Sequence, residues 1–178
     1  MKEILLTQGK ATQVDDEDYE FLNQWKWCVA KTSSTIYAKR RRKGSCRCDT
    51  ALMHRDIMKP EKGLCIDHID GNGLNNQKSN LRFCTHTQNM QNSKSETGKS
   101  RYKGVNWLGR LNKWKAEIRL NKRGIHLGVF LDDKRAALFY DEAARLLFGE
   151  FAQVNFPQLH NKGISKEVGL ILRRKLCV

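Results

Sequence analysis

Apolar and charged residues alternate most regularly in the second half of the chain, over residues 113–120. A period of two residues is typical of a strand with one buried face and one exposed face. The side predicted to be buried holds Trp114, Ala116, Ile118 and Leu120, and the other side holds Lys113, Lys115, Glu117 and Arg119. Residues 101–107 and 125–130 are candidates for one strand before this one and one strand after it.

The pattern then changes to the period of a helix. From Asp132 onward, alanines and aromatic residues recur at spacings of three and four until Gly149, which favours a helix end. We therefore predict a three-stranded antiparallel sheet packed on one helix, with the charged face of the sheet left open. A weaker pattern at 166–175 predicts a helix with a basic end, and the sequence leaves open whether it packs on the core or contacts phosphate.

The first sixty residues predict a small mixed segment. Residues 4–7, 11–14, 27–30 and 35–38 are candidates for short strands. The acidic residues 15–18 predict the start of a helix, because negative charge is stabilising at a helix N-terminus.

The middle of the chain combines strand, turn and helix signals in a short space. An apolar run at 64–66 predicts a strand, a loop rich in Gly and Asn follows, and residues 81–85 predict a second strand. Thr85 and Gln88 are spaced as in a capping box, which predicts a helix from His86. The expected order is strand, loop, strand and helix.

Four polar residues of this segment suit metal-assisted hydrolysis of a phosphodiester bond. His68 can take a proton from water, because a histidine of ordinary pKa is largely neutral at working pH. Asp67 and Asn89 offer hard oxygen donors, which suit Mg²⁺ or Mn²⁺. Asn80 is expected either to hold the hairpin or to orient His68.

The same residues resemble the HNH endonucleases, which carry a ββα-metal finger. The resemblance lies in the pair Asp67-His68, in Asn80 and in Asn89, where Asn replaces the final His, as in the phage and intron homing subgroup. It implies that His68 is the general base, that Asp67 and Asn89 bind one divalent ion per finger, and that Asn80 supports them. The pair His54-Arg55 ahead of the finger also matches this family.

The second half resembles the plant ethylene-response-factor (Apetala-type) DNA-binding domain. The residues that carry this resemblance are 102–105, 113–119, 127–130, 136–137, 140–141, 143–144, 148–149 and 154–157. It implies that the sheet enters the major groove of DNA. By matching position, Lys103, Lys113, Glu117 and Arg119 are the expected contacts, with Tyr140 near the DNA backbone, and the nearby charged residues Arg110, Lys115 and Arg123 join the set.

This second resemblance has three departures. Asn106 stands where the plant domains often have Arg, His126 replaces a common Trp, and Gly124 takes the place of an expected basic residue. The plant sequence preference therefore does not carry over to this chain.

Charge supports the division into a cutting half and a binding half. The formal net charge of +14 indicates a polyanionic partner. Residues 1–100 hold 17 Lys and Arg against 12 Asp and Glu, whereas residues 101–178 hold 16 against 7. The basic run 39–43 is either a solvated hairpin tip or a phosphate contact, and we assign Arg41 and Arg55 to DNA.

A small polar stretch without apolar periodicity marks the expected domain boundary. We predict an HNH nuclease domain at 1–92 with its finger at 64–92, a linker at 93–100, an ethylene-response-factor-like domain at 101–157, and a tail at 158–178. Neither a signal peptide nor an apolar run of membrane-spanning length is visible, so we expect a cytoplasmic protein.

The six cysteines form no C-x-x-C pair. Reduced thiols are the better interpretation in a cytosolic chain. A zinc site of Cys46 and Cys48 with Cys28 or His54 stays open.

Taken together, the sequence predicts an α+β protein of two domains that nicks double-stranded DNA with one Mg²⁺ or Mn²⁺. We expect neither a membrane partner nor a small-molecule substrate, and the choice between monomer and dimer stays open. One alternative is a DNA-binding regulator that does not cut. A weaker alternative is an RNA-binding protein, although the usual aromatic stacking motif is missing.

Overall fold

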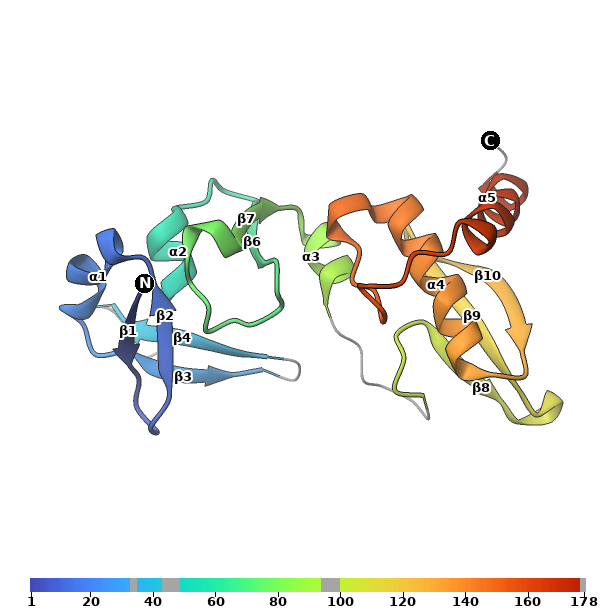
Figure 1. Ribbon diagram of the computed structural model, residues 1–178. Coiled ribbons are helices and arrows are strands. Elements are labelled where there is room, and N and C mark those ends of the chain that lie inside the picture. The colour runs from blue at the N-terminus through green and yellow to red at the C-terminus, as the bar shows by residue number, and fades with distance from the viewer. Residues whose placement is uncertain (33–34, 43–48, 94–99, 177–178) are drawn as a thin grey trace. The chain divides into compact units, whose positions relative to one another are not determined.

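The computed structural model describes residues 1–32, 35–42, 49–93 and 100–176 (Figure 1). The chain divides into two compact units, unit 1 at Met1–Ser93 and unit 2 at Lys94–Val178. Both units mix helices with antiparallel strands, which confirms the predicted α+β class. Most of the predicted linker, residues 94–99, lies outside the described residues.

Unit 1 begins with a hairpin and a helix. Strands β1 (Lys2–Leu5) and β2 (Ala11–Val14) pair in antiparallel register, and helix α1 (Asp16–Asn23) follows with its acidic first turn. This segment supplies much of the buried core of unit 1, which consists of Ile4, Leu6, Val14, Leu22, Trp27, Ala38 and Met53.

A three-stranded sheet and a short helix complete this part of unit 1. The strands are β3 (Cys28–Lys31), β4 (Ile36–Arg41) and β5 (Thr50–Leu52), and helix α2 (Met53–Met58) follows directly. The sequence pattern did not predict α2. Within the basic run, Arg40 lies over the Trp25 ring at 4.0 Å and pairs with Asp56 at 2.9 Å, so it is part of the packing.

The finger follows as a second hairpin and a helix. Strand β6 (Cys65–His68) pairs with β7 (Leu81–Cys84), and a single turn η1 (Lys78–Asn80) precedes β7. Helix α3 (His86–Asn92) starts at the predicted capping box: the Gln88 backbone N–H donates to Thr85 Oγ1, and the Thr85 backbone N–H donates to Gln88 Oε1. The predicted order of strand, loop, strand and helix is confirmed.

Unit 2 is built on the predicted antiparallel sheet. The sheet consists of strands β8 (Val105–Leu108), β9 (Lys113–Leu120) and β10 (Arg123–Phe130), in the order β10-β9-β8. The turn η2 (Gly109–Leu111) connects β8 to β9. Helix α4 (Asp133–Phe148) lies along one face of this sheet (Figure 1). Ala116 and Ile118 of β9 are buried against the helix, whereas Lys113 and Arg119 are exposed.

Both ends of α4 form as the sequence predicts. Asp132 caps the start by accepting from the Arg135 N–H at 3.0 Å, and Gly149, with φ at +54°, ends the helix. A turn η3 (Gly149–Phe151) follows. Asp141 of α4 is fully buried and accepts from the N–H groups of Asn155 (2.7 Å) and Phe156 (2.8 Å), which ties the following segment to the helix.

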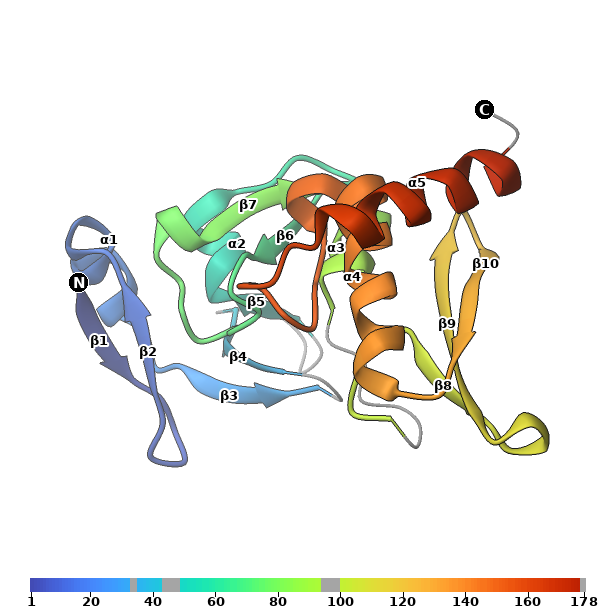
Figure 2. The ribbon, with the colours of Figure 1, turned by 45° about the vertical axis from the view of Figure 1, so that its right-hand side comes forward.

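Helix α5 (Lys162–Leu176) extends this unit. It lies beside α4 and near β10 (Figure 2), and its Val168 and Leu172 join the core of unit 2. Of the two alternatives for this segment, packing on the core therefore applies to its apolar side. No helix in the described ranges is both long and apolar enough to cross a membrane.

A glycine before β8 offers a test of the packing in unit 2. Gly104 has φ at +76°, and a Cβ built there would lie 1.9 Å from the Tyr140 ring on α4. We expect Gly104→Ala to destabilise unit 2 by about 2–4 kcal/mol, since a left-handed backbone and an overpacked contact are both unfavourable. Hydrogen exchange of the β9 amides in the full-length chain measures this loss.

Gly109→Ala is the matched control, because its nearest neighbour would be Trp107 Nε1 at an unstrained 3.9 Å. Equal protection of the β9 amides in the Gly104→Ala and Gly109→Ala proteins would contradict the described contact.

Candidate active site

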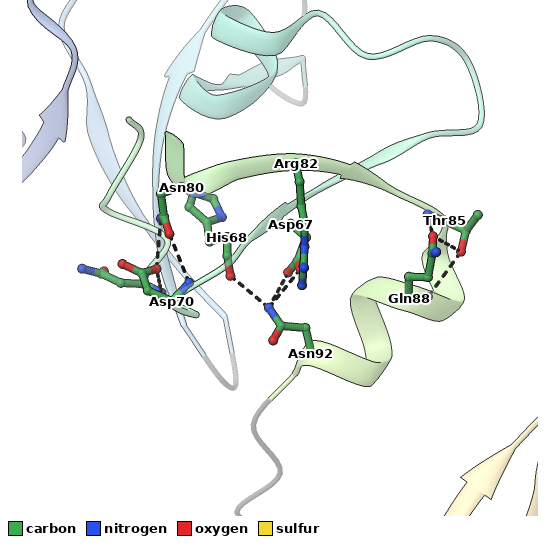
Figure 3. A network of polar contacts seen from close by, with 9 residues as sticks. Asp67, His68, Asp70, Asn80, Arg82, Thr85, Gln88 and Asn92 are labelled. Carbon is green, nitrogen blue, oxygen red and sulfur yellow. Dashed lines mark hydrogen bonds and ion pairs between the residues drawn. The ribbon is translucent and has the colours of Figure 1, made fainter. Parts of the chain in front are cut away.

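Asp67 and His68 end strand β6 and point to opposite faces of the hairpin, as successive residues of a strand do. Both are almost fully buried, with exposed fractions of 4% and 5%. Figure 3 shows Asp67 facing Arg82 and Asn92, while His68 lies on the other side of the strand. The predicted base and the predicted metal ligand are therefore adjacent in sequence and both buried, but their side chains lie on opposite faces of the hairpin.

The Asp67 carboxylate is held from two directions. Arg82, its register partner on β7, donates to Oδ2 from Nε at 2.9 Å and from Nη2 at 2.7 Å. The Asn92 amide donates to Oδ1 at 2.9 Å and to Oδ2 at 3.0 Å, and it also reaches the His68 carbonyl at 3.0 Å (Figure 3). The ion pair with Arg82 compensates the charge of a buried carboxylate, which is costly when unpaired.

The His68 ring is enclosed by residues from earlier segments of unit 1. Its centroid lies 5.0 Å from that of His54 on α2 and 5.7 Å from that of Tyr37 on β4. Its Nε2 lies 3.3 Å from Asn76 Oδ1. Burial lowers the pKa of His68, and it lowers the pKa of His54 to about 3, so both imidazoles are neutral at pH 7.

Asn80 holds the loop between the two strands of the finger. Its amide nitrogen donates to Asp70 Oδ1 at 3.0 Å and to the Asn75 carbonyl at 2.9 Å, and its Oδ1 accepts from the Asp70 N–H at 3.1 Å (Figure 3). Burial alone would raise the pKa of Asp70, but hydrogen bonds from Asn72, Asn75 and Asn80 lower it. These contacts support the first of the two roles expected for Asn80, which is to hold the hairpin.

The loop also packs tightly against β4. A Cβ built on Gly73 would lie 2.4 Å from the Ile36 carbonyl oxygen and 2.6 Å from the Tyr37 ring. Only a residue without a side chain fits there, because both neighbours belong to a paired strand. Tyr37 in turn lies beside the ring of His68, with the two ring centroids 5.7 Å apart.

The two asparagines of α3 differ in their contacts. Asn89, the predicted ligand, is half-buried, and its backbone N–H donates to the Thr85 carbonyl. Asn92, which the sequence reasoning missed, is 6% exposed and contacts Asp67. Helical spacing could have identified Asn92. A residue three positions beyond Asn89 lies on the same side of the helix, and the capping box shows where that helix starts.

The donors near Asp67 suit a hard divalent ion. Asp67 supplies carboxylate oxygens from β6, and Asn92 of α3 contacts them through its amide nitrogen. Mg²⁺ commonly takes one or two protein oxygens and completes its shell with water and substrate phosphate. Within the described ranges, no group of three or more His, Cys, Asp and Glu side chains forms a metal cage.

The alternative zinc site is not tested, because Cys46 and Cys48 lie outside the described residues. Cys28, Cys65 and Cys84 are free thiols, and Cys65 lies opposite Cys84 in the register of the finger. His54 is enclosed by the Tyr37 and His68 rings.

The predicted DNA-binding residues are mostly accessible. In unit 2, Arg110, Lys113, Arg119 and Arg123 are exposed, and in unit 1 Arg41 and Arg55 are exposed. Lys115 and Glu117 are half-buried and form an ion pair of 2.7 Å within β9. Burial lowers the pKa of Lys103, which precedes β8, to about 8.

Comparisons with known proteins support the resemblance of the finger to the HNH endonucleases. The sequence model of the HNH endonuclease family matches residues 59–91. An uncharacterized HNH endonuclease of Acanthamoeba polyphaga mimivirus is 31% identical over 159 residues, which are 85% of this chain and 79% of that protein. Protein 3.8 of Escherichia phage T7 is 38% identical over 58 residues, which cover 32% of this chain and 48% of that protein.

In another region, the chain is similar to plant DNA-binding proteins. Dehydration-responsive element-binding protein 2C of Arabidopsis thaliana is 42% identical over 72 residues, which are 39% of this chain and only 21% of the plant protein. The finger geometry, the family match over it and the mimiviral relative along most of the length lead to one conclusion: the chain belongs to the HNH endonuclease family.

Proposed function

We propose that this endonuclease nicks double-stranded DNA by metal-assisted hydrolysis at the finger and grips its substrate with the sheet of unit 2. The observation that carries the proposal is the burial of a neutral imidazole and a carboxylate on successive residues of β6, with Asn92 on the carboxylate. One imidazole and one proposed ion position in each finger suit one cut in one strand. A dimer of the chain would cut both strands.

His68 is the general base of the proposed reaction. Its lowered pKa keeps the ring neutral, so a ring nitrogen is able to take the proton of the attacking water. The rings of Tyr37 and His54 hold the imidazole in one place. A ring held in one position keeps its nitrogen in the geometry that proton transfer requires, and such positioning contributes a large part of catalysis.

Asp67 and an asparagine of α3 would hold the divalent ion, with Mg²⁺ or Mn²⁺ as the expected metals. When bound, such an ion polarises the scissile phosphate and stabilises the leaving oxygen. Asn92 has the better position for this role, since its amide already lies against Asp67, and turning the amide would present its oxygen. Asn89 is the ligand that the family resemblance implies.

Unit 2 would bind the DNA substrate through the charged face of its sheet. Lys113 and Arg119 project from the exposed side of β9, where they suit contact with base edges and phosphates in the major groove. The phosphate contacts of Arg41 and Arg55 would come from unit 1. A homing role rests on the resemblance of the finger to the phage and intron subgroup.

The test of this function is nicking of supercoiled plasmid in Mg²⁺ or Mn²⁺, with EDTA as the metal-free arm. We expect His68→Ala to lower the rate by at least 100-fold, because a general base contributes on the order of 10²–10⁴. His86→Ala is the matched control, since His86 is exposed at the start of α3. DNA binding, measured by fluorescence anisotropy, should be unchanged in both variants.

Undiminished nicking by His68→Ala would remove this residue from the proposed role. Tight DNA binding by the wild-type chain without any nicking in either metal would instead favour the non-cutting regulator.

The two asparagines of α3 give a second test. We expect Asn92→Ala to raise the Mn²⁺ concentration needed for half-maximal nicking by roughly 10- to 100-fold, the range seen when a group that supports a metal site is lost. Asn89→Ala should change it several-fold less, because its side chain makes no hydrogen bond to the described residues. The reverse order would assign the metal to Asn89.

Lys103 predicts a pH dependence of DNA binding. Its lowered pKa of about 8 means that the ammonium is charged below pH 8 and loses its charge as pH rises through that value. If Lys103 contacts phosphate, raising the pH from 7 to 9.5 should weaken binding by roughly tenfold, on the order of one charge-assisted hydrogen bond. Fluorescence anisotropy at constant ionic strength measures this change.

Lys103→Arg should abolish that dependence, since arginine stays charged throughout the range. An identical pH profile in the wild-type and Lys103→Arg proteins would exclude Lys103 from the phosphate contacts.

A further inference from the structure

A chain of buried hydrogen bonds connects the N-terminal hairpin to the ring of His68. Thr12 on β2 and Asn76 in the finger loop have no exposed surface. Asn76 Nδ2 donates to Thr12 Oγ1 at 2.8 Å, and Asn76 Oδ1 lies 3.3 Å from His68 Nε2. Thr12 lies 64 residues from Asn76 and well outside the segment that the family model matches.

The Leu74 carbonyl, at the end of this series of hydrogen bonds, fixes the direction of each of them. Thr12 Oγ1 lies 2.7 Å from the Leu74 carbonyl, which accepts hydrogen bonds and never donates them. Thr12 has one hydroxyl proton and must give it to Leu74, so it can only accept from Asn76. The Asn76 amide therefore presents its nitrogen to Thr12 and its oxygen to His68.

The opposite orientation of the Asn76 amide is unfavourable. It would place Asn76 Oδ1 against Thr12 Oγ1, so one hydroxyl proton would have to serve two close oxygen–oxygen contacts, and the contact without a proton would be repulsive. The 3.9 Å contact of Thr12 with Met53 Sδ is too weak to change this assignment.

Backbone hydrogen bonds hold the same elements together. The Gln13 N–H donates to the Leu74 carbonyl at 2.8 Å, and the Asn76 N–H donates to the Gln13 carbonyl at 2.8 Å. This parallel bridge between β2 and the loop fixes the Asn76 backbone, so its side chain has little freedom to approach His68 in another way.

We propose that Thr12 and Asn76 are positioning residues that hold the ring of His68 in the tautomer protonated at Nε2. An acceptor facing Nε2 requires a proton there, which leaves the lone pair on Nδ1. In the described part of the chain, no hydrogen bond engages Nδ1. Nδ1 is then the atom that takes the proton from water. This inference rests on the proposed function, because it concerns the same base.

The direct test is the tautomer itself, read from long-range ¹H–¹⁵N spectra of the histidine rings in the full-length chain. The wild-type protein should show His68 protonated at Nε2. Thr12→Val, which keeps the shape and removes the hydroxyl, should give mixed tautomers and lower kcat for nicking by roughly 10- to 100-fold with little change in KM. Thr12→Ser should restore both.

Val14→Ala is the matched control for lost stability. Val14 is equally buried and lies two residues along β2, and its truncation leaves a cavity without touching the hydrogen-bonded chain. We expect it to lower the melting temperature while leaving the His68 ring signals and kcat unchanged.

The outcomes separate the two proposals. A wild-type ring protonated at Nδ1 overturns the inference, and that measurement needs no variant to fold. If His68→Ala stops nicking while Thr12→Val keeps the wild-type tautomer and kcat, the positioning role is wrong and the proposed function stands. If His68→Ala still nicks, the proposed function fails, and the ring spectra still decide whether Thr12 and Asn76 set the tautomer.

Discussion

A two-stranded hairpin cannot bury both of its faces by itself, yet Asp67 and His68 project from opposite faces of β6 and are both inaccessible. Each face therefore needs a cover from elsewhere in the chain. Helix α3 brings Asn92 onto the carboxylate, while Tyr37 of β4, His54 of α2 and Asn76 of the loop surround the imidazole. A carboxylate and a ring with different requirements are thus kept in different surroundings one residue apart.

Features that depend on local periodicity were predictable from the sequence. Three features appear as expected: the alternation along β9, the capping box of α3 and the glycine end of α4. Each depends only on residues that are a few positions apart in the sequence. The apolar residues before Asp67 and His68 also predicted the strand that these two residues end. Asn92 required knowledge of which side of α3 faces the hairpin, so its contact with Asp67 was missed.

Features that depend on distant partners were not predictable. Helix α2 has only six residues, too few for a period to show. Arg40 belongs to a run of five basic residues that suggested solvent or phosphate, but Trp25 and Asp56, far from it in sequence, draw it into the packing.

The close approach of Gly73 to β4 bears on how this enzyme can be inherited and engineered. The family match begins at residue 59, but the loop inside it is shaped to a strand that ends at Arg41. A fragment starting at residue 59 would lack β4, against which the loop packs. Recombination or protein engineering that moves the finger to a new host therefore has to carry the N-terminal segment with it.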